Sequence, residues 1–162
     1  MRSIVKVVFV LMMSSLTPLL ADNLDSYWAE VSRRVTTGDY KGYAVTYHPD
    51  AILVNGISKK SYPISKAILG WKKGFDDVAA GNMEAGVTFR FSETLESEDT
   101  AHQTGIFNYY YTDDKGKRID SYIHFEALLV KKDGWIMMME YQKSIATLEQ
   151  WVALNSILLF DN

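Results

Sequence analysis

The chain has 162 residues, of which 48% are hydrophobic and 23% are charged, and its formal net charge is −3. This length and composition suit one globular domain with its own hydrophobic core. Acidic residues outnumber basic ones, so the sequence predicts no basic surface and no nucleic-acid partner. The absence of cysteine excludes disulfides and thiol catalysis.

The first residues have the pattern of a secretory signal peptide. Arg2 and Lys6 precede an apolar segment at residues 7–13, which is too short to span a bilayer. Ala21 supplies the small residue expected before a cleavage site, although Leu19 fits that pattern poorly. We therefore predict a signal peptide at residues 1–21 and a periplasmic or secreted protein. The alternative is an uncleaved membrane anchor.

Two helices are predicted next from apolar spacing and helix ends. Apolar residues recur at helical spacing over residues 24–37, and Gly38 ends that helix. Asp39 is a capping residue for a short second helix that reaches Tyr47. The sequence His48-Pro49 ends this helix, because the residue before a proline avoids helical backbone angles.

A short strand is expected at residues 51–54, followed by a third helix. Pro63 suits the start of this helix, whose apolar residues step by three and four as far as Val78. Gly81-Asn82 then ends it.

From residue 83 onward the apolar period changes to two, which predicts strands. Turn sequences separate the last three of four expected antiparallel strands. These strands are predicted at residues 83–92, 100–112, 117–131 and 135–143. Helices followed by a strand meander predict an α+β fold, in which three helices cover one face of a curved, mainly antiparallel sheet.

The C-terminal tail, residues 145–162, is apolar and is expected to form a helix that packs on the sheet or on a partner. Attachment to a membrane surface is the alternative. The tail lacks the flanking Lys and Arg residues of interfacial helices, so no stable membrane insertion is expected after signal cleavage.

Several landmarks together resemble the nuclear transport factor 2-like superfamily, in particular its SnoaL-like and ketosteroid isomerase-like branch. They are Gly38-Asp39, the sequence Tyr47-His48-Pro49-Asp50-Ala51, the third helix and the closing hairpin around Gly134. The resemblance implies a cone-shaped fold with an internal pocket, which we assign to residues 22–144. It implies no single activity, because the superfamily includes isomerases, cyclases, dehydratases and proteins that only bind. We also expect a homodimer formed through the sheet.

Two catalytic positions of the ketosteroid isomerases are replaced in this chain. Counted from Gly38, the tyrosine that donates to the oxyanion corresponds to Val31, and the general-base aspartate corresponds to Asn55. Neither valine nor a neutral amide can perform these roles, so steroid isomerisation by that mechanism is not expected. The third position, an acid on a late strand, corresponds to Glu126.

Glu126 lies on a strand whose polar and apolar residues alternate. One face carries Asp120, Tyr122, His124 and Glu126, and the other is apolar. If the polar face lines the pocket, Glu126 and His124 are the candidate catalytic acid and base. The alternative is that this face is the solvated outer face of an antiparallel sheet.

Aromatic residues are the main candidates for binding a ligand. Tyr43 and Tyr47 are expected near Asn55, with hydroxyls that either face the pocket or reach solvent. The predicted ligand-binding residues are Tyr43, Tyr47, Asn55, Trp71, Phe75 and Tyr109. The three histidines lack metal-ligand spacing, and no phosphate-binding loop is present, so no metal or cofactor is expected.

Three functions remain open from the sequence. The first is a domain that binds a small hydrophobic molecule, with Glu126, Asn55 and tyrosines as polar anchors. The second is a lyase- or isomerase-like enzyme that uses Glu126 or His124 as acid or base. The third is a protein-interaction module with a filled cavity. We favour the first, because two of three chemical positions are replaced while the scaffold is kept.

Overall fold

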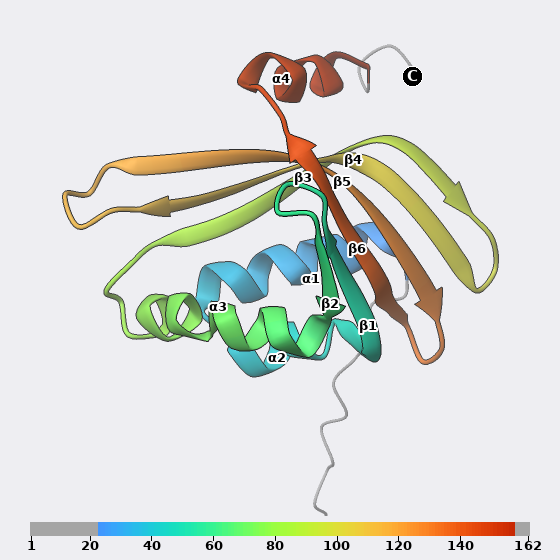
Figure 1. Cartoon of the computed structure of the whole chain (residues 1–162), viewed down its shortest axis with the longest axis horizontal. Coiled ribbons are helices and arrows are strands. Elements are labelled where there is room, and N and C mark those ends of the chain that lie inside the picture. The colour runs from blue at the N-terminus through green and yellow to red at the C-terminus, as the bar shows by residue number, and fades with distance from the viewer. Residues whose placement is uncertain (1–22, 158–162) are drawn as a thin grey trace, which may run out of the picture.

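The computed structural model describes residues 23–157, which form helices on both sides of a six-stranded sheet (Figure 1). The helices are α1 (Leu24–Thr37), α2 (Tyr40–Ala44), α3 (Ile64–Ala79) and α4 (Leu148–Ile157). The strands are β1 (Tyr47–Asn55), β2 (Lys60–Pro63), β3 (Ala85–Glu96), β4 (Thr100–Thr112), β5 (Arg118–Lys131) and β6 (Trp135–Ile145). The predicted signal peptide and the last residues of the tail lie outside the described residues.

The sheet has the strand order β2-β1-β6-β5-β4-β3. Every neighbouring pair is antiparallel except β1 and β6, which run parallel. Figure 1 shows α1, α2 and α3 on the concave side of the curved sheet and α4 on the opposite side. This arrangement confirms the predicted α+β fold with a mainly antiparallel sheet.

Local signals in the sequence explain how α1 begins and ends. The Asn23 side chain accepts a hydrogen bond from the Ser26 amide at the first turn. Gly38 follows the last turn in a left-handed conformation, with φ 68°, and its amide donates to the Val35 carbonyl. Asp39 then accepts a hydrogen bond from the Gly42 amide and starts α2.

The second helix is shorter than predicted. It ends at Ala44, and Tyr47 is the first residue of β1 rather than the last residue of the helix. Tyr47 pairs with Met137 of β6, and the register of this pairing shifts before Ile52. Pro49 therefore lies where the ladder is interrupted, at a place where its missing N–H disturbs no pairing. The short strand β2 was not predicted.

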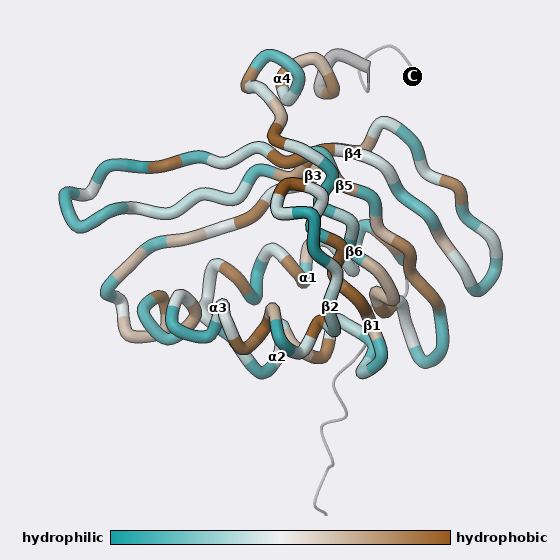
Figure 2. Tube along the Cα trace, viewed as in Figure 1, coloured by the Kyte–Doolittle hydropathy of each residue, from teal (hydrophilic) through white to brown (hydrophobic). Residues whose placement is uncertain are grey.

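The main core lies between the concave face of the sheet and α1, α2 and α3. Phe125 and Trp135 are each 1% exposed there, and Trp28 packs with its ring centroid 4.4 Å from that of Phe89. Figure 2 shows hydrophobic segments where the sheet faces the helices and hydrophilic residues at the outer ends of the hairpins. Burial of these aromatic rings is the main source of stability for the domain.

A second, smaller core lies on the opposite face of the sheet, under α4. Trp151 packs there with Ile106 and Ala146. The Arg90 guanidinium lies 4.0 Å from the centroid of the Trp151 ring and donates a hydrogen bond of 2.6 Å to the Trp151 carbonyl. The described part of the tail is therefore a helix packed on the sheet. Between residues 23 and 157, no helix has the length and hydropathy needed to cross a membrane.

Candidate functional site

A cavity of about 420 Å³ lies between the helices and the concave face of the sheet. Its walls are mainly aromatic and aliphatic, and they include Trp28, Trp71, Phe75, Phe89, Phe107 and Phe125. Gly70 on α3 and Ser121 on β5 also line the cavity and are exposed, so the cavity reaches solvent between these two elements. This volume lies within the range of small-molecule sites, about 300–1,000 Å³.

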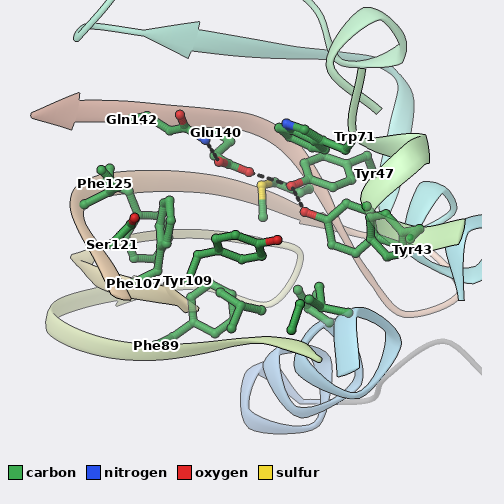
Figure 3. Close-up of a pocket in the computed structure, with 18 of the residues that line it drawn as sticks. Tyr43, Tyr47, Trp71, Phe89, Phe107, Tyr109, Ser121, Phe125, Glu140 and Gln142 are labelled. Atoms are coloured by element: carbon green, nitrogen blue, oxygen red, sulfur yellow. Dashed lines mark hydrogen bonds between the residues drawn. The ribbon is translucent and has the colours of Figure 1, made fainter. Parts of the chain in front are cut away.

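One end of the cavity carries a network of polar side chains (Figure 3). The Tyr47 hydroxyl donates a hydrogen bond of 2.5 Å to Glu140 Oε2, and Gln142 Nε2 donates one of 2.7 Å to Glu140 Oε1. The Tyr43 hydroxyl lies 3.0 Å from that of Tyr47. Because the proton of Tyr47 goes to the carboxylate, Tyr43 is the donor to Tyr47.

A bulge in β6 turns Glu140 toward the cavity. Leu128 pairs with Met139, but Leu129 pairs with Met137, so Met138 is an extra residue in the ladder. Met137 and Glu140 consequently share the inner face, although they are three positions apart. Without the bulge, strand alternation would place Met139 inside and Glu140 outside.

The surroundings of Glu140 shift the pKa of its carboxyl. Glu140 is 7% exposed, and burial raises the pKa of its carboxyl, while the hydrogen bonds from Tyr47 and Gln142 act in the opposite direction. No Lys, Arg or His is among the described residues that line the cavity. Burial also raises the pKa of Tyr43 and Tyr47, so both phenols are neutral at physiological pH.

We expect Glu140 to make stability depend on pH. Its pKa in the folded protein lies above its ordinary value of 4.5, so the folded state holds the proton more tightly than the unfolded state. The free energy of unfolding therefore falls as the pH rises from 4.5 through the raised pKa. Glu140→Gln removes this titration. The melting temperature of this variant should therefore rise relative to that of the wild type as the pH rises. Calorimetry in a pH series measures this difference.

Glu126→Gln provides a control of opposite sign. The hydrogen bond from Lys143 holds the pKa of Glu126 below its ordinary value of 4.5. Glu126 therefore stabilises the folded state at pH values above 4.5, and this stabilisation is lost as the pH falls through the lowered pKa. The melting temperature of Glu126→Gln should therefore fall relative to that of the wild type as the pH rises. A difference between Glu140→Gln and the wild type that stays constant with pH would contradict the prediction for Glu140.

The structure brings most of the predicted ligand-binding residues together. The cavity is lined by Tyr43, Tyr47, Trp71, Phe75 and Tyr109. Asn55 is not among the lining residues. Its Nδ2 donates a hydrogen bond of 3.3 Å to Gln142 Oε1, and its Oδ1 accepts one of 2.8 Å from the Ser58 amide. Asn55 therefore orients Gln142, which in turn contacts Glu140.

Glu126 and His124 lie on the opposite face of the sheet, outside the cavity lining, so of the two alternatives for this polar face the outer-face one corresponds to the structure. Lys143 Nζ donates a hydrogen bond of 2.6 Å to Glu126, and His102 Nε2 lies 3.4 Å from it. His124 Nε2 lies 3.2 Å from Gln150 Oε1 on α4. The apolar residues of β5 face the cavity, so strand alternation directs the polar ones outward.

The acid in the cavity is thus Glu140, which sequence reasoning did not select. The signal for it was a single acid within the mainly apolar run from Trp135 to Tyr141. A carboxylate on a buried strand is unusual enough to mark a candidate site. Within residues 23–157, no group of three His, Cys, Asp or Glu residues is placed to hold a metal ion.

Comparison with known proteins rests on structure, since no family model and no curated protein matches this sequence. An NTF-2 like protein of unknown function from Shewanella oneidensis MR-1 is 16% identical, with a TM-score of 0.56, covering 73% of this chain and 93% of that one. Aln2 from a Streptomyces species is 17% identical, with a TM-score of 0.57, covering 80% and 91%.

An NTF2-like protein from Cytophaga hutchinsonii ATCC 33406 is 12% identical, with a TM-score of 0.54, covering 73% of this chain and 92% of that one. The chain therefore has the nuclear transport factor 2-like fold, which confirms the fold expected from the resemblance. Identities this low establish the fold alone, and the function has to be argued from the site itself.

Proposed function

We propose that this domain binds a small, mainly hydrophobic molecule in the cavity beneath the sheet. The observation that carries the proposal is a cavity of about 420 Å³ with aromatic walls and one polar end. Aromatic walls remove the apolar surface of a ligand from water, and a few convergent polar groups fix its orientation. Glu140 and its hydrogen-bond partners supply those polar groups.

The geometry supports this function over the two alternatives from the sequence. A protein-interaction module was expected to have its cavity filled by side chains, whereas this cavity is open to a ligand. An acid–base enzyme was expected to use Glu126 or His124, and both lie on the outer face, where they have no access to the cavity.

The cellular location and the oligomeric state belong to the same proposal. The pattern of residues 1–21 supports a periplasmic or secreted protein, and those residues lie outside the described part of the chain. A homodimer through the sheet stays a prediction. Size-exclusion chromatography with light scattering of the processed protein tests it.

The proposed function is tested by closing the exposed end of the cavity. We expect the wild type to enhance the fluorescence of a neutral hydrophobic dye, such as Nile red. Ser121→Phe adds a ring where the cavity meets solvent and should weaken dye binding at least about tenfold, equivalent to about 1.4 kcal/mol. Fluorescence titration measures both affinities. Native mass spectrometry of the purified protein then identifies any molecule that it carries.

Ser58→Phe is the matched control, because Ser58 is exposed and lies outside the cavity lining. It should bind the dye as the wild type does. Equal binding by Ser121→Phe and the wild type would show that the dye does not occupy this cavity and would overturn the proposed function.

A further inference from the structure

We propose that the ligand of this cavity is a cationic amine, whose ammonium group pairs with Glu140 at the polar end. The inference rests on the proposed function, because it assigns a chemical class to the ligand of the same cavity.

Glu140 has no cationic partner within the described residues. It is 7% exposed, and its hydrogen-bond partners, Tyr47 and Gln142, are neutral. The acids Glu30, Asp76 and Glu126, by contrast, pair with Arg or Lys at the surface. A buried carboxylate without a counter-ion is costly, and a cation supplied by a ligand removes that cost.

The hydrogen bonds that Glu140 accepts favour a carboxylate over a carboxylic acid. Tyr47 and Gln142 both donate to Glu140, one to each oxygen. The orientation of the Gln142 amide is fixed, because its Oε1 accepts from Asn55 and Asn55 in turn accepts from the Ser58 amide. The chain therefore directs an N–H group at Glu140 instead of an acceptor.

The polar end of the cavity keeps hydrogen-bonding capacity for a ligand. A carboxylate accepts about four hydrogen bonds, so Glu140 keeps two lone-pair sites after Tyr47 and Gln142 have donated. Tyr43 uses its proton on Tyr47 and keeps acceptor lone pairs only. The unused acceptor sites of Glu140 and Tyr43 thus match the N–H donors of an ammonium group, and the carboxylate repels an anion.

The surroundings of Glu140 are aromatic. Figure 3 shows Tyr43, Tyr47 and Trp71 beside it, with the Tyr109 hydroxyl directed toward those of Tyr43 and Tyr47. Electron-rich ring faces attract a desolvated cation. Hydrocarbon side chains make up most of the remaining lining, including Val87, Phe89, Phe107 and Phe125, and suit the apolar body of the amine.

A neutral ligand that accepts a hydrogen bond from a protonated Glu140 is the competing arrangement. Burial raises the pKa of this carboxyl, which acts in favour of that arrangement. The two arrangements predict opposite preferences for the charge of a ligand. Two probes of the same shape, the cation 4-phenylbutylamine and the neutral 4-phenylbutanol, therefore separate them.

The test is calorimetric titration of both probes at neutral pH. We expect the wild type to bind the amine at least about tenfold more tightly than the alcohol, because a charge-assisted hydrogen bond exceeds a neutral one by about this factor. Glu140→Gln should lose that preference. Glu126→Gln, the same change on the outer face, should keep it. Circular dichroism establishes that both variants are folded.

Equal binding of the two probes by the wild type, or tighter binding of the alcohol, overturns the inference without the use of any variant. An amine preference that survives in Glu140→Gln also overturns it. If neither probe binds while the neutral dye still occupies the cavity, the inference fails and the proposed function stands. If the dye does not bind in the cavity either, the proposed function is wrong as well.

Discussion

Replacing Phe125 with alanine should lower the free energy of unfolding by about 3–5 kcal/mol. Phe125 is 1% exposed on the inner face of β5. Ring centroids of Trp28, Phe89 and Phe107 lie 5.8, 5.8 and 5.4 Å from its own. The substitution removes the side chain that these rings share, and neighbours on a rigid sheet close such a space only in part. Urea denaturation followed by circular dichroism measures the loss.

Leu128→Ala is the control on the same strand. Leu128 is 38% exposed, so its truncation should change the free energy of unfolding by no more than about 0.5 kcal/mol. A loss below about 1 kcal/mol for Phe125→Ala would mean that the helices collapse into the space, contrary to the expected rigidity of the core.

Gly38→Ala should cost about 2–4 kcal/mol, although it adds a single methyl group. The φ of 68° at Gly38 is unfavourable for any residue with a Cβ. A Cβ there would also overlap the backbone of α3, at the Ala79 amide and, at 2.7 Å, the Phe75 carbonyl oxygen. Backbone atoms cannot rotate away as a side chain can, so α1 and α3 have to separate. Thermal denaturation measures the loss.

Gly81→Ala separates these two causes. Gly81 has a φ of 74°, but no atom lies within 4 Å of the position that a Cβ would take, so alanine there meets only the conformational penalty of about 1–2 kcal/mol. Gly38→Ala should therefore be the more damaging of the two. Equal losses would show that α1 and α3 move apart at no cost.

The parts of the fold that were predictable are those with a local cause. Residues 24–37 form the predicted helix because their apolar spacing and Gly38 act within a few turns. The strands β4 to β6 follow from alternation and turn sequences. The end of α2 was misplaced, because Tyr47 is drawn into β1 by pairing with β6, a partner far away in the sequence.

The site was predictable in its aromatic walls but not in its acid. Tyr43, Trp71 and Tyr109 were selected from helix and strand patterns and do line the cavity. Glu140 was missed because a one-residue bulge at Met138 reverses the alternation of β6, and nothing in the local sequence marks that bulge.

The parallel pairing of β1 with β6 has a consequence for the order in which the chain folds. Tyr47 and Glu140, which form a hydrogen bond across this part of the fold, are 93 residues apart in sequence. Contacts of such wide separation form late, since the entropy of closing the intervening loop is lost before they stabilise anything. The meander from β3 to β5 pairs between neighbours and needs no such closure. A chain synthesised from its N-terminus therefore acquires helices and hairpins well before it acquires a binding site.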